Sequence, residues 1–379
     1  MRKIAFLTGS RGEWGYIRPI IQLIDQDPEL DYSIIATNMH LLSEFGISVN
    51  EIEKEGFRVD EKVYMTYDGY NAETMAKSLG SLMMELPSVL RRVKPDVLVL
   101  AGDRGEQLVG AIAGLHLGIA VAHIQAGELT GNVDGIVRHA ITKLAHVHFT
   151  ANEEFAQRVE RMGEHKFRIY TTGAPLTDEL IRRRVTNEEE LRKRYNLKSN
   201  EKIILAVQHP VTEEESVAGE HIEETISALL ETDMTVIFIY PNADAGSEKI
   251  RSKLNQTKNK KFKFFRNMPR DDYLGMMKIA SVIVGNSSSG IMEAPTFGTP
   301  CVNIGRRQNM RLQAANVINV SYNKDEILAA IKKATDPEFV KIAKNCKNPY
   351  GDGKASEKIV KILKGLIIDE KLLNKEMAY

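Results

Sequence analysis

Residues 123–143 concentrate side chains that could bind a ligand or move protons. The segment carries amide, carboxylate, guanidinium and imidazole groups, and it follows an apolar run at residues 118–122. A short apolar run bounded by polar residues is typical of a buried parallel strand, and open α/β sheets bind ligands at the carboxyl ends of such strands. Asp134 and Arg138 are four residues apart, so on a helix they share one face. The segment therefore predicts an active site at a strand end.

A simpler interpretation of this segment is a helix cap at Asn132 or Asp134 with an ordinary ion pair. A second polar cluster argues against it, because Asp103 and Arg104 closely follow another apolar run, at residues 97–101. The carboxyl ends of parallel strands meet at one edge of a sheet, so the two clusters would lie together. The sequence thus predicts one site that neighbouring strand ends share.

A glycine-containing loop is predicted at residues 9–15, between the first strand and the first helix. Glycines let backbone N–H groups approach a phosphate closely, and a helix N-terminus adds partial positive charge. Arg11 in this loop would suit an anion. The spacing is neither that of a Walker loop nor that of the dinucleotide fingerprint, and a plain tight turn is the alternative interpretation.

The second half of the chain repeats the pattern of polar residues after apolar runs. Ser287 and Ser288 lie where a strand is predicted to end and a helix to begin, so their hydroxyls and nearby N–H groups would bind a diphosphate. Glu293, one turn into that helix, could accept two ribose hydroxyls, although a capping box is the alternative. Other strand ends in this half carry His209, Asn242 and Arg307.

The elements that must position these groups alternate along the chain. Apolar runs predict strands at residues 3–8, 32–37, 97–101, 119–124, 146–150, 202–208, 234–240, 262–265, 281–284 and 300–304. Amphipathic segments predict helices at residues 16–25, 74–92, 105–117 and 134–144. This order predicts an α/β protein with right-handed crossovers and parallel sheets. The pattern breaks at residues 171–175, which predicts two Rossmann-like domains, residues 1–175 and 176–355, with a cleft between them. A last helix at residues 355–373, within a segment 356–379, is expected to return to the first domain.

Composition limits the classes of function. The 379 residues are enough for two domains, and the formal net charge of zero gives no general attraction to nucleic acid or to an anionic membrane. Two cysteines, Cys301 and Cys346, fit a reducing cytoplasm and exclude a disulfide scaffold. No apolar stretch approaches the ~20 residues of a membrane span, and no His/Cys cluster has the spacing of a metal site. We therefore expect a cytoplasmic protein without a metal centre.

Taken together, these motifs resemble the hydrolysing UDP-N-acetylglucosamine 2-epimerases, which feed the synthesis of sialic-acid-type and legionaminic-acid-type sugars. The resemblance runs from Gly9 to about Lys361, and its most specific part is Asp134-x-x-x-Arg138-His-Ala-Ile-Thr-Lys143. It implies a fold like the B-type glycosyltransferases, an active site between the domains and a homodimer. It also implies anti elimination of UDP to a 2-acetamidoglucal, followed by hydration to the free manno sugar, without a metal or nicotinamide cofactor.

The resemblance also implies roles for the individual residues. Asp103 and Asp134 would be the acid/base carboxylates, and Arg138 would be a charge partner near the sugar. Tyr273 would pack beside the uracil. The positions that would bind the nucleotide or its diphosphate are Arg11, Arg104, His209, Asn242, Ser287, Ser288, Glu293 and Arg307. The domain at residues 1–175 would then hold the sugar and the domain at residues 176–355 would hold UDP.

Gln125 departs from the family pattern. Many relatives have a glutamate there, which is proposed as a catalytic carboxylate, and a glutamine cannot take up a proton in that role. Either Glu128 replaces the missing carboxylate or Gln125 only orients the sugar. The departure also leaves the substrate open between UDP-N-acetylglucosamine, a UDP-2,4-diacetamido-trideoxy sugar such as UDP-N,N'-diacetylbacillosamine, and a GDP counterpart.

Two other functions are weighed against this one. A non-hydrolysing epimerase would keep UDP on the sugar, but such enzymes carry Glu-Ala-Gly-Leu-Arg where this chain has Gln125-Ala-Gly-Glu-Leu. A B-type glycosyltransferase would give the pair of Asp103 and Asp134 no evident role. The products distinguish the three: free sugar and UDP, an epimeric UDP-sugar, or a glycoside.

Overall fold

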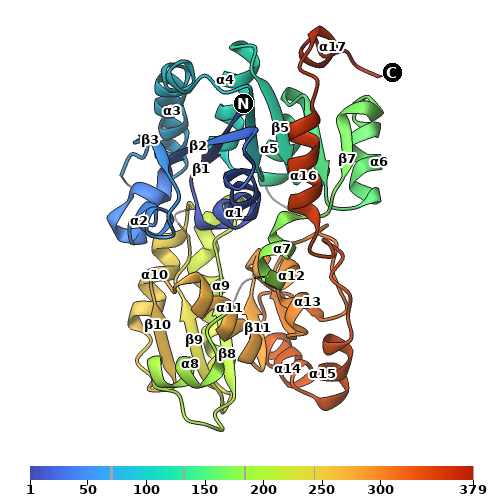
Figure 1. Ribbon diagram of the computed structural model, residues 1–379. Coiled ribbons are helices and arrows are strands. Elements are labelled where there is room, and N and C mark those ends of the chain that lie inside the picture. The colour runs from blue at the N-terminus through green and yellow to red at the C-terminus, as the bar shows by residue number, and fades with distance from the viewer. Residues whose placement is uncertain (69–70, 131–132, 183–184, 243, 379) are drawn as a thin grey trace.

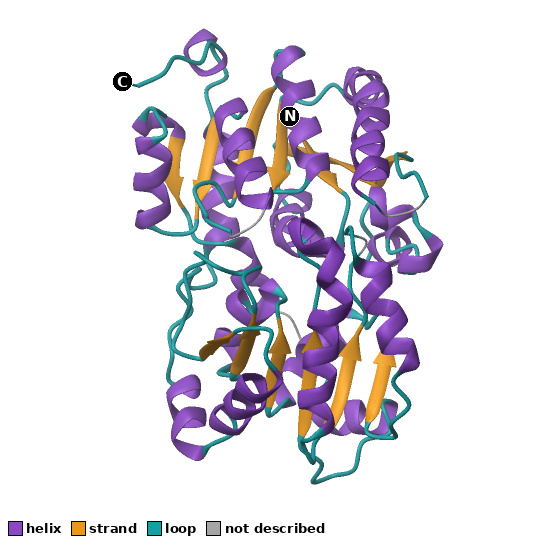
Figure 2. Ribbon diagram, turned by 180° about the vertical axis from the view of Figure 1, so that it is seen from behind, coloured by secondary structure: helices purple, strands orange, loops and turns teal. Residues whose placement is uncertain are grey.

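Two parallel β-sheets, one above the other in Figure 1, form the framework of the protein in the computed structural model. The structure describes residues 1–68, 71–130, 133–182, 185–242 and 244–378, so Asn132 lies outside it. Helices cover both faces of each sheet, as Figure 2 shows. The α/β architecture predicted from the sequence is therefore confirmed. We call the two units built on these sheets the N-terminal and C-terminal domains; the domain boundaries drawn from the sequence stay predictions.

The sheet of the N-terminal domain has the strand order β3-β2-β1-β4-β5-β6-β7. Every residue of the central strand β4 is buried, as expected for a parallel sheet covered on both faces. The order reverses between β1 and β4, and such a switch point is where α/β sheets bind ligands. The strand bounds are β1 Arg2–Thr8, β2 Leu30–Thr37, β3 Val59–Val63, β4 Val97–Ala101, β5 Ala120–Ile124, β6 Val147–Thr150 and β7 Ile169–Thr171.

The sheet of the C-terminal domain has the order β10-β9-β8-β11-β12-β13, with its own switch point between β8 and β11. The strand β8 is again buried throughout. The strand bounds are β8 Ile203–Val207, β9 Thr235–Ile239, β10 Phe262–Phe265, β11 Val282–Gly285, β12 Cys301–Ile304 and β13 Val317–Val320. Each domain therefore presents one switch point to a ligand.

The helices follow the strands in the order expected of α/β units. Those of the N-terminal domain are α1 Arg11–Asp25, α2 Val49–Lys54, α3 Ala72–Val93, α4 Gly105–His116, α5 Val133–Leu144, α6 Glu153–Arg161 and α7 Pro175–Arg182. Those of the C-terminal domain are α8 Glu188–Arg194, α9 Ala218–Leu230, α10 Ser247–Gln256, α11 Arg270–Ile279, α12 Ser288–Met292, α13 Ala294–Phe297, α14 Lys324–Ala334 and α15 Pro337–Lys344. None of the helices within the described residues is both long and apolar enough to cross a membrane.

The prediction of a glycine loop at residues 9–15 was wrong in its extent. Helix α1 already begins at Arg11, because Ser10 and Glu13 form a capping box in which each side chain binds the other's backbone N–H. Gly12 and Gly15 are therefore helical. The N-terminus of α1 still follows β1 directly, so Arg11 keeps its place at the strand end.

The single helix predicted at residues 355–373 was also wrong, because the structure has two helices, α16 Ala355–Gly365 and α17 Glu370–Leu373. Helix α16 ends at a glycine and is followed by extended backbone at Leu366. It packs on the N-terminal domain, where Arg2 Nη1 donates to the backbone oxygen of Lys364 at 2.9 Å (Figure 1). The chain thus crosses back to its first domain after completing the second.

Candidate active site

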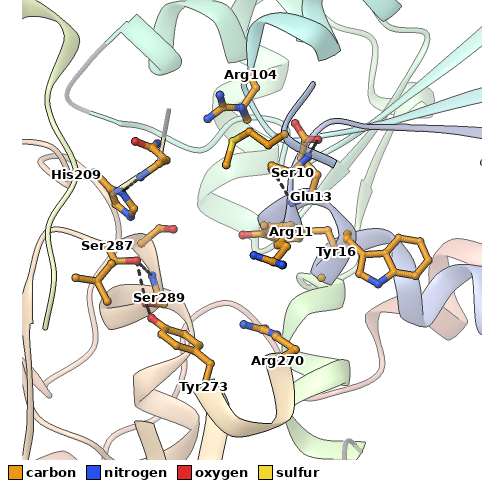
Figure 3. Close-up of a pocket in the computed structure, with 18 of the residues that line it drawn as sticks. Ser10, Arg11, Glu13, Tyr16, Arg104, His209, Arg270, Tyr273, Ser287 and Ser289 are labelled. Carbon is orange, nitrogen blue, oxygen red and sulfur yellow. Dashed lines mark hydrogen bonds between the residues drawn. The ribbon is translucent and has the colours of Figure 1, made fainter. Parts of the chain in front are cut away.

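A cavity of about 360 Å³ lies where the carboxyl ends of the two sheets face each other. Its volume is within the usual range of ligand pockets. Figure 3 shows Arg11 and Arg104 of the N-terminal domain on one side and His209 and Ser287 of the C-terminal domain on the other. Both domains therefore contribute walls to one cavity, as the two switch points predict.

Most of the residues singled out in the sequence line this cavity. They are Arg11, Asp103, Arg104, Gln125, Asp134, His209, Asn242, Tyr273, Ser287, Ser288, Glu293 and Arg307. Glu128 and Arg138 are not among the lining residues, because both are buried behind the wall of the N-terminal domain, with exposed fractions of 1% and 0%. The structure thus brings all the predicted residues to one place but puts these two in a supporting layer.

Asp103 is held by an arginine of its own domain. Arg138, on the inner face of α5, donates from Nη2 to Asp103 Oδ2. The Nε and Nη1 atoms of Arg138 are buried and have no hydrogen-bond partner among the described residues. A buried guanidinium with one engaged nitrogen fixes the position of the Asp103 carboxylate and leaves further donors beside it.

Asp134 lies one turn before Arg138 on α5, as the four-residue spacing predicted. Burial raises the pKa of Asp134 to about 6, and the neighbouring carboxylates of Asp103 and Asp244 add to this effect. A carboxyl group with a pKa near the working pH can both release and accept a proton. Asp134 is therefore suited to acid–base chemistry in the cavity.

Gln125 and Glu128 face each other, although strict strand alternation would put them on opposite sides. Gln125 has a φ of 69° and Gly127 a φ of 78°, so the backbone turns after β5 instead of staying extended. Gln125 Nε2 donates to Glu128 Oε2 at 3.1 Å and to the hydroxyl of Tyr16 at 2.9 Å. Burial raises the pKa of Glu128, while Arg138 and Arg311 oppose that rise. Gln125 thus lines the cavity and Glu128 supports it from behind.

The wall of the C-terminal domain is rich in hydroxyl groups. Ser287 caps the start of α12 through Ser289 N, and the hydroxyls of Tyr273 and Ser289 lie 2.6 Å apart (Figure 3). Glu293 is not a free acceptor, because both of its oxygens accept from Arg270, at 3.1 and 3.2 Å. This wall therefore offers hydroxyls and a neutralised carboxylate to a ligand.

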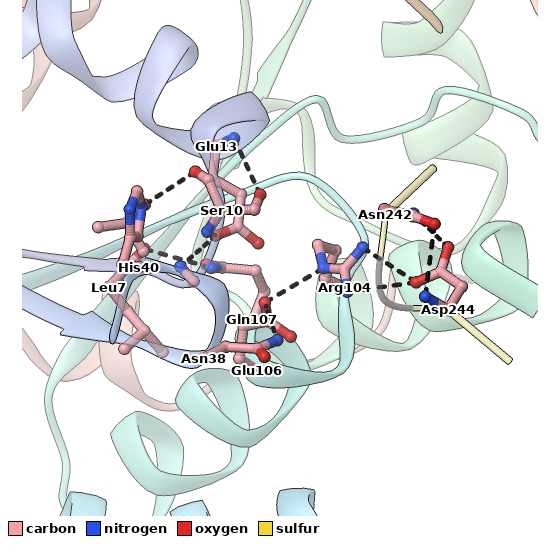
Figure 4. A network of polar contacts seen from close by, with 12 residues as sticks. Leu7, Ser10, Glu13, Asn38, His40, Arg104, Glu106, Gln107, Asn242 and Asp244 are labelled. Carbon is pink, nitrogen blue, oxygen red and sulfur yellow. Dashed lines mark hydrogen bonds and ion pairs between the residues drawn. The ribbon is translucent and has the colours of Figure 1, made fainter. Parts of the chain in front are cut away.

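Charged groups also connect the two walls (Figure 4). Arg104 of the N-terminal domain lies 3.4 Å from Asp244 Oδ1 of the C-terminal domain. Burial alone would raise the pKa of Asp244, but Arg104, Arg307 and His209 outweigh burial and lower it. Burial lowers the pKa of His209 to about 3, so its ring is neutral at pH 7. Its Nδ1 atom accepts from the backbone N–H of Asn242 at 3.1 Å.

The family of the chain follows from comparison with known proteins. The family model described as UDP-N-acetylglucosamine 2-epimerase matches residues 22–364. The chain belongs to the UDP-N-acetylglucosamine 2-epimerase family. The family predicted from the sequence motifs is therefore confirmed.

Similar members of this family include hydrolysing enzymes. The chain is 36% identical over 380 residues to the UDP-N,N'-diacetylbacillosamine 2-epimerase (hydrolyzing) of Legionella pneumophila, and the match covers 100% of both chains. It is 35% identical over 344 residues to the GDP/UDP-N,N'-diacetylbacillosamine 2-epimerase (hydrolyzing) of Campylobacter jejuni, which covers 89% of this chain and 88% of that one.

A solved structure supports the fold. The crystal structure of the UDP-GlcNAc 2-epimerase of Neisseria meningitidis bound to UDP-GlcNAc superposes with a TM-score of 0.81 at 19% identity. The superposition covers 95% of this chain and 99% of that one. The two-domain arrangement predicted from the sequence is thus that of a solved family member.

Several cavity residues of this epimerase were not predicted from the sequence. They are Glu13, Tyr16, Arg270 and Arg311, and Asp244 joins them through Arg104. The signal for Glu13 was present, since Ser10 and Glu13 have the spacing of a capping box. Arg311 lies four residues after Arg307 in the segment that follows β12, so the rule of polar residues at strand ends could also have found it. Asp244 follows β9 and Arg270 follows β10, so the same rule could have found them too.

Proposed function

We propose that this protein is a hydrolysing 2-epimerase of a UDP-activated 2-acetamido sugar, with UDP-N,N'-diacetylbacillosamine as its preferred substrate. The products would be UDP and the free manno-configured sugar. The observation that carries the proposal is the pairing, across one cavity, of acid–base carboxylates on one wall with hydroxyls and cations on the other. The choice of sugar is supported by the activity named for the Legionella and Campylobacter relatives.

The first step in this proposal is an elimination. A carboxylate removes the proton from C2, the C2–H electrons form the C1–C2 double bond, and the electrons of the C1–O bond leave with UDP. We assign the proton removal to Asp103, whose position Arg138 fixes. Arg104 and Arg307 line the same cavity and would stabilise the charge that develops on the leaving diphosphate.

The second step is hydration of the resulting 2-acetamidoglucal. The oxygen of water bonds to C1 while the water releases one proton to the solvent, and C2 receives a proton on the face opposite to the one that lost it, which inverts C2. We assign this proton to Asp134, because its raised pKa of about 6 lets it hold a proton near neutral pH. Glu128 would supply the second carboxylate that Gln125 lacks, acting from behind the cavity wall.

UDP would occupy the wall of the C-terminal domain. Ser287, Ser288 and Arg307 line this wall and would bind the diphosphate, with His209 and Asn242 beside them. Tyr273 would pack against the uracil, and Glu293, oriented by Arg270, would accept from the ribose hydroxyls. The wall of the N-terminal domain would contribute Arg11 and Arg104.

Product analysis tests this function. Proton NMR of reactions with UDP-N,N'-diacetylbacillosamine and with UDP-N-acetylglucosamine should show UDP and a free manno sugar, formed faster from the former. Accumulation of an epimeric UDP-sugar would instead identify a non-hydrolysing epimerase. Formation of a glycoside only when an acceptor is added would identify a glycosyltransferase.

The homodimer and the cytoplasmic location that the family resemblance implies belong to the same proposal. Light scattering of the purified protein should give about twice the chain mass of 42.5 kDa. A mass of one chain at the concentration used for the activity assay would contradict the dimer.

A further inference from the structure

An arginine of the C-terminal domain reaches into the carboxylates of the N-terminal domain. Arg311, in the segment after β12, has its Nη1 atom 3.4 Å from Glu128 Oε2 and its Nη2 atom 3.8 Å from Asp103 Oδ2. Its side chain is only 8% exposed, and it lines the cavity. The contact therefore joins two carboxylates of one domain to a cation of the other.

The segment that carries Arg311 is anchored in the C-terminal domain. Gln308 Nε2 donates to the backbone oxygen of Asn286, at the end of β11, at 2.9 Å. Arg311 also contacts Met292 Sδ of α12 at 2.9 Å. The C-terminal domain thus holds this segment, and a separation of the two domains would move the guanidinium away from Glu128.

Arg138 differs from Arg311 in this respect. It lies on α5 of the same domain as Asp103 and Glu128, so its charge stays beside them in any arrangement of the domains. Arg311 of the C-terminal domain contacts carboxylates of the N-terminal domain, and Arg104 of the N-terminal domain contacts Asp244 of the C-terminal domain. Only a closed cleft brings both arginines to their partners.

We propose that Arg311 is a positioning residue that completes the active site when the cleft closes, by orienting Glu128 and keeping it ionised. The inference rests on the proposed function and adds a residue to it. Glu128 is 1% exposed, and without Arg311 only Arg138 and the amide of Gln125 would offset the cost of burying its charge. An open cleft would leave Glu128 without Arg311, and closure would restore this contact.

The groups that face Glu128 make the expected pH effect explicit. They are Arg138 on α5, Arg311 after β12, Asp103 after β4, Tyr16 on α1 and Tyr350 before α16. Burial raises the pKa of Glu128, and the two arginines lower it. Loss of the Arg311 charge would therefore raise this pKa further, and the acid limb of the kcat profile would move to higher pH.

The test uses Arg311→Met, which keeps the length of the side chain and removes its charge, with Arg311→Lys as the conservative variant. Arg92→Met on α3, which breaks an exposed ion pair with Glu61 of β3, is the matched control. We expect Arg311→Met to lower kcat by roughly tenfold, within the loss expected when Glu128 itself is replaced, with UDP affinity in calorimetry changed less than about threefold. The acid limb of the kcat profile of Arg311→Met should move to higher pH. Arg311→Lys should recover part of the lost kcat and keep the acid limb of the wild type. Arg92→Met should match the wild type in both kcat and pH profile.

A double variant separates action through Glu128 from a general loss of structure. In a Glu128→Gln background, Arg311→Met should have little further effect on kcat, because the group through which it acts is already gone. If Arg311→Met lowered kcat by the same factor in the wild-type and Glu128→Gln backgrounds, the proposal would be overturned. It would also be overturned if Arg311→Met lowered only the affinity for UDP, or if the acid limb of its kcat profile did not move. If the wild-type enzyme itself releases no free sugar from either substrate, the proposed function fails; if it is active and Arg311→Met is equally active, only the role of Arg311 fails.

Discussion

The carboxyl groups on the two sides of the cleft have pKa values that are shifted in opposite directions. On the wall of the N-terminal domain, burial raises the pKa of Glu13, Glu128 and Asp134. On the wall of the C-terminal domain, Asp244 has a lowered pKa, because arginines and a histidine outweigh its burial. One wall therefore holds carboxyl groups that can carry protons, and the other holds groups whose charge is fixed.

This difference follows from the cations beside each carboxyl group, and those beside Asp244 come from both walls, Arg104 from one and Arg307 from the other. Arg270 lies 3.1 Å from Glu293 and stays charged, since the carboxylates of Glu293 and Glu179 outweigh its burial and raise its pKa. Proton transfer needs a group whose pKa is near the working pH, whereas binding a diphosphate needs charges that do not change. The comparison predicts that variants of the first wall lose turnover and that variants of the second wall lose UDP affinity.

The largest effect should come from the carboxylates that touch the reacting atoms. Asp103→Asn and Asp134→Asn keep the shape of the side chain but cannot exchange a proton. Each should lower kcat by roughly a hundredfold or more, the scale of a lost general acid or base. UDP affinity in calorimetry should remain close to that of the wild type. Near-normal turnover of both variants would remove the distinction between the walls.

A somewhat smaller effect is expected behind the wall of the N-terminal domain. If Glu128 replaces the missing carboxylate, Glu128→Gln should lower kcat by roughly ten- to a hundredfold. Gln125→Ala should keep substantial activity, because its amide only bridges Tyr16 and Glu128. Steady-state kinetics on the true substrate compare the two, and a fully active Glu128→Gln enzyme would rule out this relocation of the carboxylate.

Variants of the C-terminal wall should lose affinity for UDP and keep their turnover. Ser288→Ala should weaken UDP binding about fivefold, the scale of one lost hydrogen bond. Glu293→Ala should weaken it by about tenfold, because it also leaves Arg270 without one of its carboxylates. Ser252→Ala, at an exposed position of α10, is the control. Calorimetry that showed unchanged UDP affinity for both variants would reduce the serine segment to a helix cap.

The smallest effect concerns stability and pH. The pKa of Asp134 is about 6 in the folded protein, above the 3.8 that is usual for an aspartate, so the folded state binds this proton more tightly than the unfolded state does. The ionised group therefore costs stability above pH 6, and the cost disappears as the pH falls from 6 toward 3.8. Asp134→Asn should raise Tm by on the order of 2 °C at pH 8 and much less at pH 4. Thermal scans at both values measure this, and equal shifts would contradict it.

Much of the fold could be predicted because buried parallel strands are continuous apolar runs. The strands that were not predicted, β3, β7 and β13, all lie at the edge of a sheet. β3 reads Val-Asp-Glu-Lys-Val and is only partly buried, so it lacks that signal. An edge strand is covered less completely and tolerates charged residues, which hides it in the sequence.

The features of the candidate site also divide into those that could be predicted from the sequence and those that could not. Residues that directly follow strands, such as Asp103 and His209, could be predicted because the topology alone brings them together. The cross-cleft contacts of Arg311 and Asp244 could not be predicted, since they depend on how the two domains face each other. The turn at Gln125, with its φ of 69°, also escaped prediction, because a non-glycine residue in that conformation has no simple sequence signal.

The measurement that tests the account most directly is proton NMR of the wild-type reaction in D2O. If the carboxylates of the N-terminal wall break and remake the C2–H bond while the C-terminal wall releases UDP, the free manno sugar should carry one deuterium at C2. A free sugar that keeps its original C2 proton would contradict the account, because the carboxylates would then have no part in the reaction.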